Sequence, residues 1–88
     1  MGDMAVRSPV HAQFGETIRA IRKQRGVSQE SLALSCGLDR TYISGIERGA
    51  RNPSLTNILK IALALNIGPT ELFADIRLDR DGLGGDVR

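Results

Sequence analysis

The chain has 88 residues, an apolar fraction of 41% and a net charge of only +2. That length suffices for one small domain with a single core, and the core must be aliphatic because aromatic residues make up 3% of the chain. The sequence excludes a disulfide framework, since Cys36 is its only cysteine, and a membrane span, since no run approaches the roughly 18 apolar residues required. No apolar run of signal-peptide length occurs near the start, so we expect a cytoplasmic protein.

The charge is unevenly distributed along the chain. Residues 7–52 hold eight basic and four acidic side chains, a net charge of +4. Residues 71–88 hold three basic and five acidic side chains, a net charge of −2. A basic region of this kind is typical of a surface that meets nucleic-acid phosphates.

The first part of the chain is expected to hold an arm and one helix. Residues 1–12 are predicted to form a flexible arm, because Pro9 disfavours regular structure. The first helix is predicted over residues 14–25, with Gly26 ending it. Its apolar positions recur at spacings of four and three: Phe14, Ile18 and Ile21.

Two short helices separated by a glycine are predicted next. Ser28 is a good N-cap for a second helix that runs to about Ser35, and Asp39 is a good N-cap for a third over residues 40–48. Gly37 lies where a tight turn needs a positive φ angle, which costs glycine nothing. The inward positions of the two helices are all apolar: Leu32, Ala33, Leu38, Ile43 and Ile46.

The remaining residues predict two more helices and a tail. Ser54 caps a strongly apolar fourth helix over residues 55–65, and Pro69 opens a short fifth helix to about Ile76. Residues 77–88 are charged and glycine-rich, and we expect them to be disordered. The fold class predicted by these elements is all-α.

The predicted third helix has a polar, basic face opposite its apolar side. That face recurs at spacings of three and four: Arg40, Thr41, Ser44, Gly45 and Arg48. A helix that is dry on one side and offers hydrogen-bonding groups on the other fits the DNA major groove. The pair of helices therefore predicts a helix-turn-helix DNA reader.

Three segments resemble the Cro/cI-type helix-turn-helix family of bacterial and phage regulators, also called the xenobiotic-response-element family. They read IRAIRKQRGVSQESLA, GLDRTYISGIERGARNPSL and LKIALALNI, and the resemblance covers residues 14–73. It implies a five-helix, lambda-repressor-like DNA-binding domain over residues 13–76. Within the family, LDRTYISGIERGARNPS is most similar to the small controller proteins of restriction-modification systems.

The resemblance implies DNA contacts for residues of the second and third helices and the loop that follows. Base readout is implied for Arg40, Thr41, Tyr42, Ser44 and Gly45. Phosphate contact is implied for Gln29, Arg48, Arg51 and Asn52. An arginine can bind guanine bidentately, and a threonine methyl can touch the thymine methyl.

Six of these positions have a second interpretation, which for Arg48, Arg51 and Asn52 is an ordinary solvated surface. Gln29 can buttress the third helix as well as bind a phosphate. Tyr42 can pack against the first or second helix instead of contacting DNA. Gly45 stands where other members of the family have a long polar reader, so either close approach to DNA or simple tolerance accounts for it.

A structural ion pair is also implied by the resemblance. An acid near the C-terminal end of a DNA-reading helix opposes both the phosphates and the helix dipole. Glu47 has this position. In the family the equivalent acid pairs with an arginine of the first helix, which here is Arg22.

The last two predicted helices hold more apolar side chains than one small core needs: Leu63, Leu65, Ile67, Leu72 and Phe73. This surplus predicts a homodimer, because a twofold dimer matches a pseudo-palindromic DNA site. We expect Leu72 and Phe73 to lie in the dimer interface. The alternative is an antitoxin-type protein that binds a partner toxin as well as its own operator.

The sequence does not favour an enzyme, a cofactor or a metal site. His11 has no partner at metal-ligand spacing and is expected to be a solvated side chain, while Cys36 is expected to be a small core hydrophobe. No phosphate-cradling GxxxxGKS or GxxxxGKT motif occurs. We expect a transcriptional regulator that binds double-stranded DNA, without a membrane or a small-molecule effector.

Overall fold

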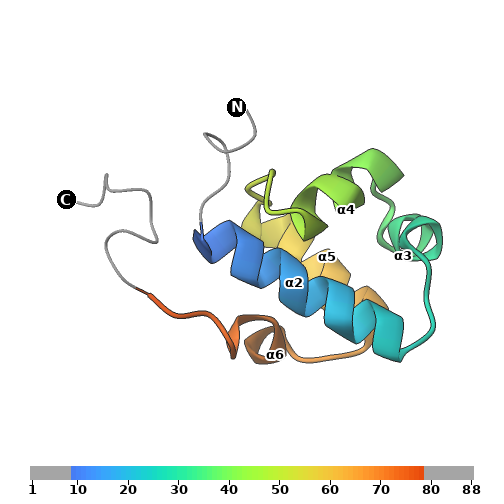
Figure 1. Ribbon diagram of the computed structural model, residues 1–88. Helices are drawn as coiled ribbons and strands as arrows, with labels where there is room; N and C mark the ends of the chain where they lie inside the picture. Colours follow the sequence, from blue (N-terminus) through green and yellow to red (C-terminus); the bar gives the residue numbers. More distant parts are fainter. Residues whose placement is uncertain (1–8, 79–88) are drawn as a thin grey trace.

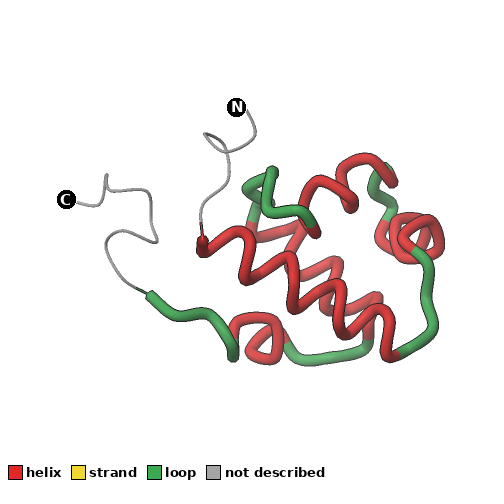
Figure 2. Tube along the Cα trace, viewed as in Figure 1, coloured by secondary structure: helices red, strands yellow, loops and turns green. Residues whose placement is uncertain are grey.

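The computed structural model describes residues 9–78, which form five α-helices and no strand (Figures 1 and 2). The helices are α2 (Pro9–Gln24), α3 (Gln29–Cys36), α4 (Arg40–Glu47), α5 (Leu55–Leu65) and α6 (Pro69–Phe73). The all-α prediction is confirmed for this part of the chain. Within it, no helix is both long enough and apolar enough to cross a membrane. The predicted tail from residue 79 onward lies outside the described residues.

The first helix begins earlier than predicted. α2 starts at Pro9, so residues 9–12 belong to the helix and that part of the predicted arm is wrong. A proline is tolerated in the first turn because its missing N–H would have no intrahelical partner there. His11 consequently lies in α2 and is half-buried, whereas the sequence predicted a solvated side chain. Residues 1–8 of the predicted arm lie outside the described residues.

Side-chain caps begin the three central helices where they were predicted. The donors and acceptors are Ser31 N–H to Ser28 Oγ, Thr41 N–H to Asp39 Oδ2 and Asn57 N–H to Ser54 Oγ, at 3.0, 3.0 and 3.1 Å. Gly37 ends α3 with a φ angle of 71°, in the left-handed region that favours glycine. These local signals fix the tight turn between α3 and α4.

The core is mainly aliphatic, with Phe14 also buried in it, and receives side chains from all five described helices. Its largest fully buried members are Ile18, Leu32, Ile43, Ile46, Ile61, Leu65 and Leu72. Cys36 is buried beside them as predicted, and burial raises the pKa of its thiol. A domain of this size has room for only one such core, so each helix contributes to the same cluster.

The position of Leu72 corrects the predicted dimer interface. Leu72 is 0% exposed, so it belongs to the core of the monomer and its assignment to a dimer interface is wrong. The short helix α6 contacts both α2 and α5, which directs Leu72 inward while Phe73 stays 42% exposed. Two adjacent apolar residues at a helix end give no sequence signal of which one faces the core.

Two glycines allow α2 to lie close against the end of α4. A side chain at Gly15 would clash with the carbonyl oxygens of Ile46 and Glu47. A Cβ atom at Gly49 would lie 2.7 Å from the Cα of Ala12. Because both positions lack a side chain, the backbone of α2 reaches the last turn of α4.

Leu72→Ala should lower the free energy of unfolding by about 2–5 kcal/mol, because it removes buried methyl groups and leaves a cavity. Urea unfolding followed by circular dichroism measures the change. Leu34→Ala is the matched control, since Leu34 is 83% exposed on α3, and it should change the stability by less than about 0.5 kcal/mol. Equal effects of the two substitutions on the free energy of unfolding would show that Leu72 is not buried in the core.

Candidate nucleic-acid interface

α4 presents polar side chains on the side away from the core. Arg40 and Thr41 are exposed, Ser44 is half-buried, and the three line a hollow of about 170 Å³, here called the base-reading hollow. On the opposite side of α4, Ile43 and Ile46 are buried. The predicted division into a polar and an apolar face is confirmed, and base readout by the three polar residues stays a prediction.

Gly45 does not lie open to a ligand. It is buried, and a Cβ atom there would lie 2.6 Å from the Cγ of Arg51. The missing side chain makes room for Arg51, whose aliphatic part lies across α4 at this point. The predicted base contact of Gly45 is therefore wrong, and the packing of Arg51 accounts for a glycine inside the helix. Arg51 comes from the loop after α4, so no spacing within the helix indicates this contact.

Tyr42 packs on the start of α5 and under Arg51. Its hydroxyl accepts a hydrogen bond of 3.0 Å from Nδ2 of Asn57, and the guanidinium carbon of Arg51 lies 5.6 Å from the ring centroid. An arginine at this distance from an aromatic face is attracted by the ring. Tyr42 is also partly buried against the core, as the packing interpretation predicted, although these two contacts come from α5 and the loop after α4 and not from the first or second helix. Contact of Tyr42 with DNA stays a prediction.

The ion pair between α2 and α4 is confirmed. Nε and Nη2 of Arg22 donate to the two carboxylate oxygens of Glu47 at 2.7 and 3.0 Å. Nη1 of Arg22 donates to the carbonyl oxygen of Val27 at 2.8 Å. The hydrogen bond to Glu47 raises the pKa of Arg22, so the guanidinium stays charged although it is buried. Both side chains are almost fully buried, which makes this a structural contact and not a pair of base readers.

Gln29 takes part in the same network. Its Nε2 donates to Oε1 of Glu47 at 2.9 Å, so the buttressing interpretation of Gln29 is confirmed. Its phosphate contact stays a prediction, as do those of Arg48, Arg51 and Asn52, all three of which are exposed. Arg48 is the C-cap residue of α4, which places it next to the buried pair.

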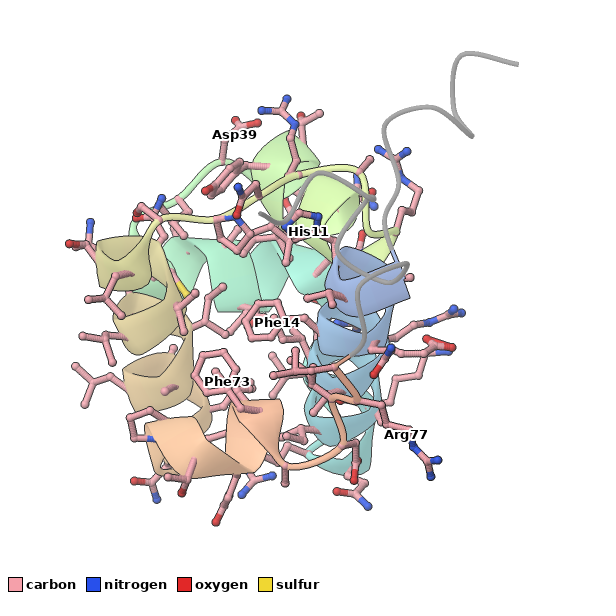
Figure 3. All side chains as sticks on the ribbon, turned by 90° about the vertical axis from the view of Figure 1, so that its left-hand side faces the viewer. His11, Phe14, Asp39, Phe73 and Arg77 are labelled. Atoms are coloured by element: carbon pink, nitrogen blue, oxygen red, sulfur yellow. The ribbon has the colours of Figure 1, made fainter. Side chains whose placement is uncertain are left out.

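A small apolar hollow of about 160 Å³ lies between the start of α2, α5 and α6. The rings of Phe14 and Phe73 stack there, with centroids 5.6 Å apart (Figure 3). His11 lines the same hollow. Its apolar walls suit contact with another apolar surface and do not suit a phosphate.

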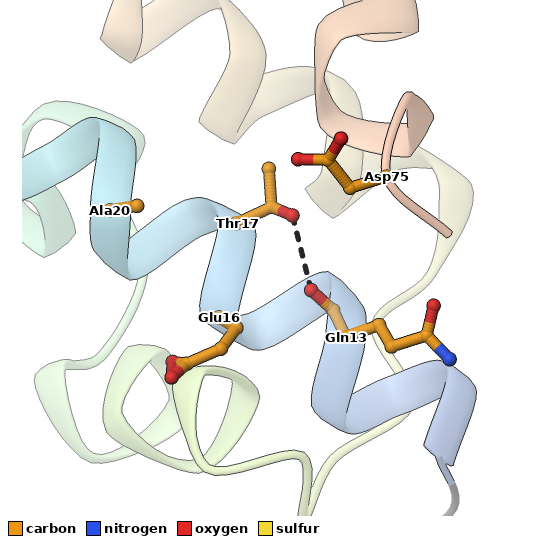
Figure 4. Close-up of a pocket in the computed structure, with 5 residues that line it drawn as sticks. All are labelled: Gln13, Glu16, Thr17, Ala20 and Asp75. Carbon is orange, nitrogen blue, oxygen red and sulfur yellow. Dashed lines mark hydrogen bonds between the residues drawn. The ribbon is translucent and has the colours of Figure 1, made fainter. Parts of the chain in front are cut away.

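A larger, shallow hollow of about 360 Å³ lies between α2 and the segment after α6 (Figure 4). Its charged lining residues are Glu16 and Asp75, and this negative charge does not suit DNA. Thr17 Oγ1 donates to the carbonyl oxygen of Gln13, and the amide of Arg77 donates to Oε1 of Gln13 at 2.7 Å. The second bond fixes the segment after α6 against α2.

α4 has an exposed polar face, and its other side packs on α3 across a tight turn and is joined to α2 by a buried ion pair. This arrangement is that of a helix-turn-helix DNA-binding protein. The chain belongs to the helix-turn-helix family, whose family model (HTH_3) matches residues 18–72. Membership of this family of DNA-binding regulators confirms that the chain is not an enzyme.

Several known proteins that resemble this chain are restriction-modification controller proteins. The chain is 55% identical over 61 residues to Control protein C.BamHI of Bacillus amyloliquefaciens, covering 68% of this chain and 75% of that protein. It resembles the crystal structure of the restriction-modification controller protein C.AhdI from Aeromonas hydrophila, with a TM-score of 0.71 and 56% identity, covering 72% of this chain and 96% of that one. It also resembles the controller protein C.Esp1396I, solved as a tetramer in complex with its natural 35 base-pair operator, with a TM-score of 0.68 and 37% identity over 74% of this chain and 86% of that one. The predicted family resemblance is confirmed.

Glu47→Ala is expected to lower the free energy of unfolding by about 3–5 kcal/mol, because the guanidinium of Arg22 then stays buried without its counter-ion. The double variant Arg22→Met with Glu47→Leu should recover much of this loss, since it leaves no unpaired charge. Glu30→Ala removes an exposed acid from α3 and is the control. Urea unfolding of the variants measures the effect, and equal stability of Glu47→Ala and Glu30→Ala would contradict a stabilising buried pair.

Proposed function

We propose that this chain is a sequence-specific transcriptional regulator that acts as a homodimer on a pseudo-palindromic operator and controls a restriction-modification system. The observation that carries the proposal is the polar outer face of α4, fixed from behind by the buried pair of Arg22 and Glu47. Identities of 55% and 56% to C.BamHI and C.AhdI support the controller assignment. A regulator of this kind works beside the chromosome, so the proposal includes a cytoplasmic location.

In this proposal α4 enters the major groove with its N-terminal end nearest the bases. α4 begins at Arg40, whose guanidinium would bind O6 and N7 of a guanine, and the methyl group of Thr41 would touch a thymine methyl. Ser44 follows one turn later on the same face. The proposed phosphate contacts flank the groove: Gln29, Arg48, Arg51 and Asn52.

A homodimer follows from the small footprint of one recognition helix. One helix covers only a few base pairs, too few to select a site among the roughly 10⁶ or more competing sites of a genome. Two copies place their recognition helices about 34 Å apart, which matches one turn of DNA. The tetramer of C.Esp1396I on its operator supports binding by more than one copy.

Exposed apolar side chains suggest where the two copies meet. On α5 they lie at intervals of four residues: Leu55, Leu59 and Leu63, which are 69%, 44% and 81% exposed. Side chains four apart share one face of a helix, so they form a continuous apolar stripe. Phe73 on α6 is the remaining member of the predicted interface, since Leu72 is buried. We propose that this stripe and Phe73 supply the dimer contacts.

Arg40→Ala should weaken binding to the cognate operator by about 1–3 kcal/mol and affect random DNA much less, because a bidentate base contact is lost. Fluorescence anisotropy on both duplexes measures the difference, once the operator has been selected from random DNA. Arg51→Ala is the comparison, since loss of a phosphate contact weakens both duplexes alike. If Arg40→Ala also weakens both equally, Arg40 contacts a phosphate and the base assignment fails.

Leu63→Asp and Phe73→Asp are expected to give folded monomers with weaker operator binding, because a charge would be buried in the apolar interface. Size-exclusion chromatography and helical circular dichroism report assembly and folding separately. Leu34→Asp, at an exposed site on α3, should remain dimeric. Retained dimerisation by both test variants would place the interface elsewhere, and a monomeric unmodified protein would favour a heterologous partner such as a toxin.

A further inference from the structure

A further hollow, of about 280 Å³, adjoins the base-reading hollow, and Ser44 lines both. Three helices and the C-cap of α4 contribute to it: Arg19, Arg22, Gln29, Ser44, Glu47 and Arg48. We call it the phosphate hollow. Arg19 is the only one of these residues to which neither the sequence nor the family resemblance assigned a role.

The charges in this hollow leave a net positive site. Glu47 is the only acid that lines it, and both of its carboxylate oxygens accept hydrogen bonds from Arg22 or Gln29. Its charge is thereby matched by that of Arg22. The two remaining cations, Arg19 and Arg48, are both exposed. The hollow therefore offers an anion two guanidinium groups that its own acid does not neutralise, while Glu16 lies beside Arg19 on α2, outside this hollow.

The polar groups around the cations suit a phosphate of a DNA backbone. Gln29 and Ser44 are half-buried and supply further hydrogen-bonding groups. α3 begins at Gln29, and the first N–H groups of a helix have no intrahelical partner. The hollow also shares Ser44 with the base-reading hollow, so an anion there would lie directly beside the proposed base contacts.

We infer that the phosphate hollow binds a backbone phosphate at the edge of the major groove, with Arg19 of α2 and Arg48 as its cationic contacts. This inference rests on the proposed function, because it requires α4 to face DNA. It adds the first helix to the DNA-binding surface. The close approach of α2 to the end of α4 at Gly15 explains how a residue of α2 reaches this surface (Figure 1).

The test compares Arg19→Gln with Arg25→Gln, which removes the same charge from an exposed position just after α2 and outside the hollow. Anisotropy titrations over a range of salt concentrations are made with the selected operator and with a random duplex. Arg19→Gln should weaken binding to both duplexes by the same factor. The slope of log K against log salt should become shallower by about 0.9 for one lost contact, or about 1.8 for a symmetric dimer, and Arg25→Gln should leave it unchanged.

A second measurement identifies the phosphate itself. Single neutral methylphosphonates are placed in turn along the operator, and the affinity of each modified operator is measured. One position should weaken binding of the unmodified protein but should not weaken binding of Arg19→Gln any further. Arg19→Lys, which keeps the charge, should retain most of the salt slope. Unchanged circular dichroism and thermal unfolding establish that the exposed substitution leaves the fold intact.

The possible outcomes separate this inference from the proposed function. A salt slope of Arg19→Gln equal to that of Arg25→Gln overturns the inference. Weakening confined to the operator overturns it too, because Arg19 would then contact a base. If the unmodified protein prefers no DNA sequence, the proposed function is wrong. The salt slope on the random duplex then still tests whether Arg19 contacts a phosphate.

Discussion

The bidentate ion pair between Arg22 and Glu47 is the contact on which the DNA-facing surface depends. It joins the first helix to the last turn of α4, and Gln29 ties the start of α3 to the same carboxylate. Desolvation of two charges is costly, and only good geometry with satisfied hydrogen bonds offsets it. That condition is met here, because no buried side-chain nitrogen or oxygen within residues 9–78 lacks a partner. The orientation of α4 relative to α2 and α3 is consequently fixed before any DNA is bound, which lowers the ordering cost of binding.

Close backbone packing supports the ion pair. Gly15 and Gly49 let α2 lie against the end of α4, where Glu47 meets Gly15 through its backbone and Arg22 through its side chain. A larger residue at Gly15 would push the helices apart and lengthen hydrogen bonds that are now 2.7 and 3.0 Å. The same proximity brings Arg19 to the margin of α4, so a packing requirement of the fold also shapes the charge of its surface.

Local signals made most of the helices predictable, whereas contacts between distant residues did not follow from the sequence. Ser28, Asp39 and Ser54 cap their helices through neighbours two or three residues away, and such short-range chemistry is readable in one sequence. The ion pair was predicted only through the family resemblance. Leu72, the Gly45–Arg51 contact and the bond from Asn57 to Tyr42 depend on how helices and loops meet in space, and no periodicity reports that. The early start of α2 was missed because Pro9 was treated as a helix breaker, although the first turn tolerates it.

The buried cysteine gives the domain a built-in reporter of its own opening. Cys36 is the only thiol of the chain, it is 8% exposed, and burial raises its pKa, so the reactive thiolate is scarce in the folded state. Modification by a thiol reagent therefore requires the packing of α3 against α5 to open first. The labelling rate of the unmodified protein then measures how often this core separates, and a ligand that binds only the closed form slows that rate in proportion to its occupancy. Stabilisation by DNA becomes measurable at a single sulfur atom, without a label engineered into the recognition surface.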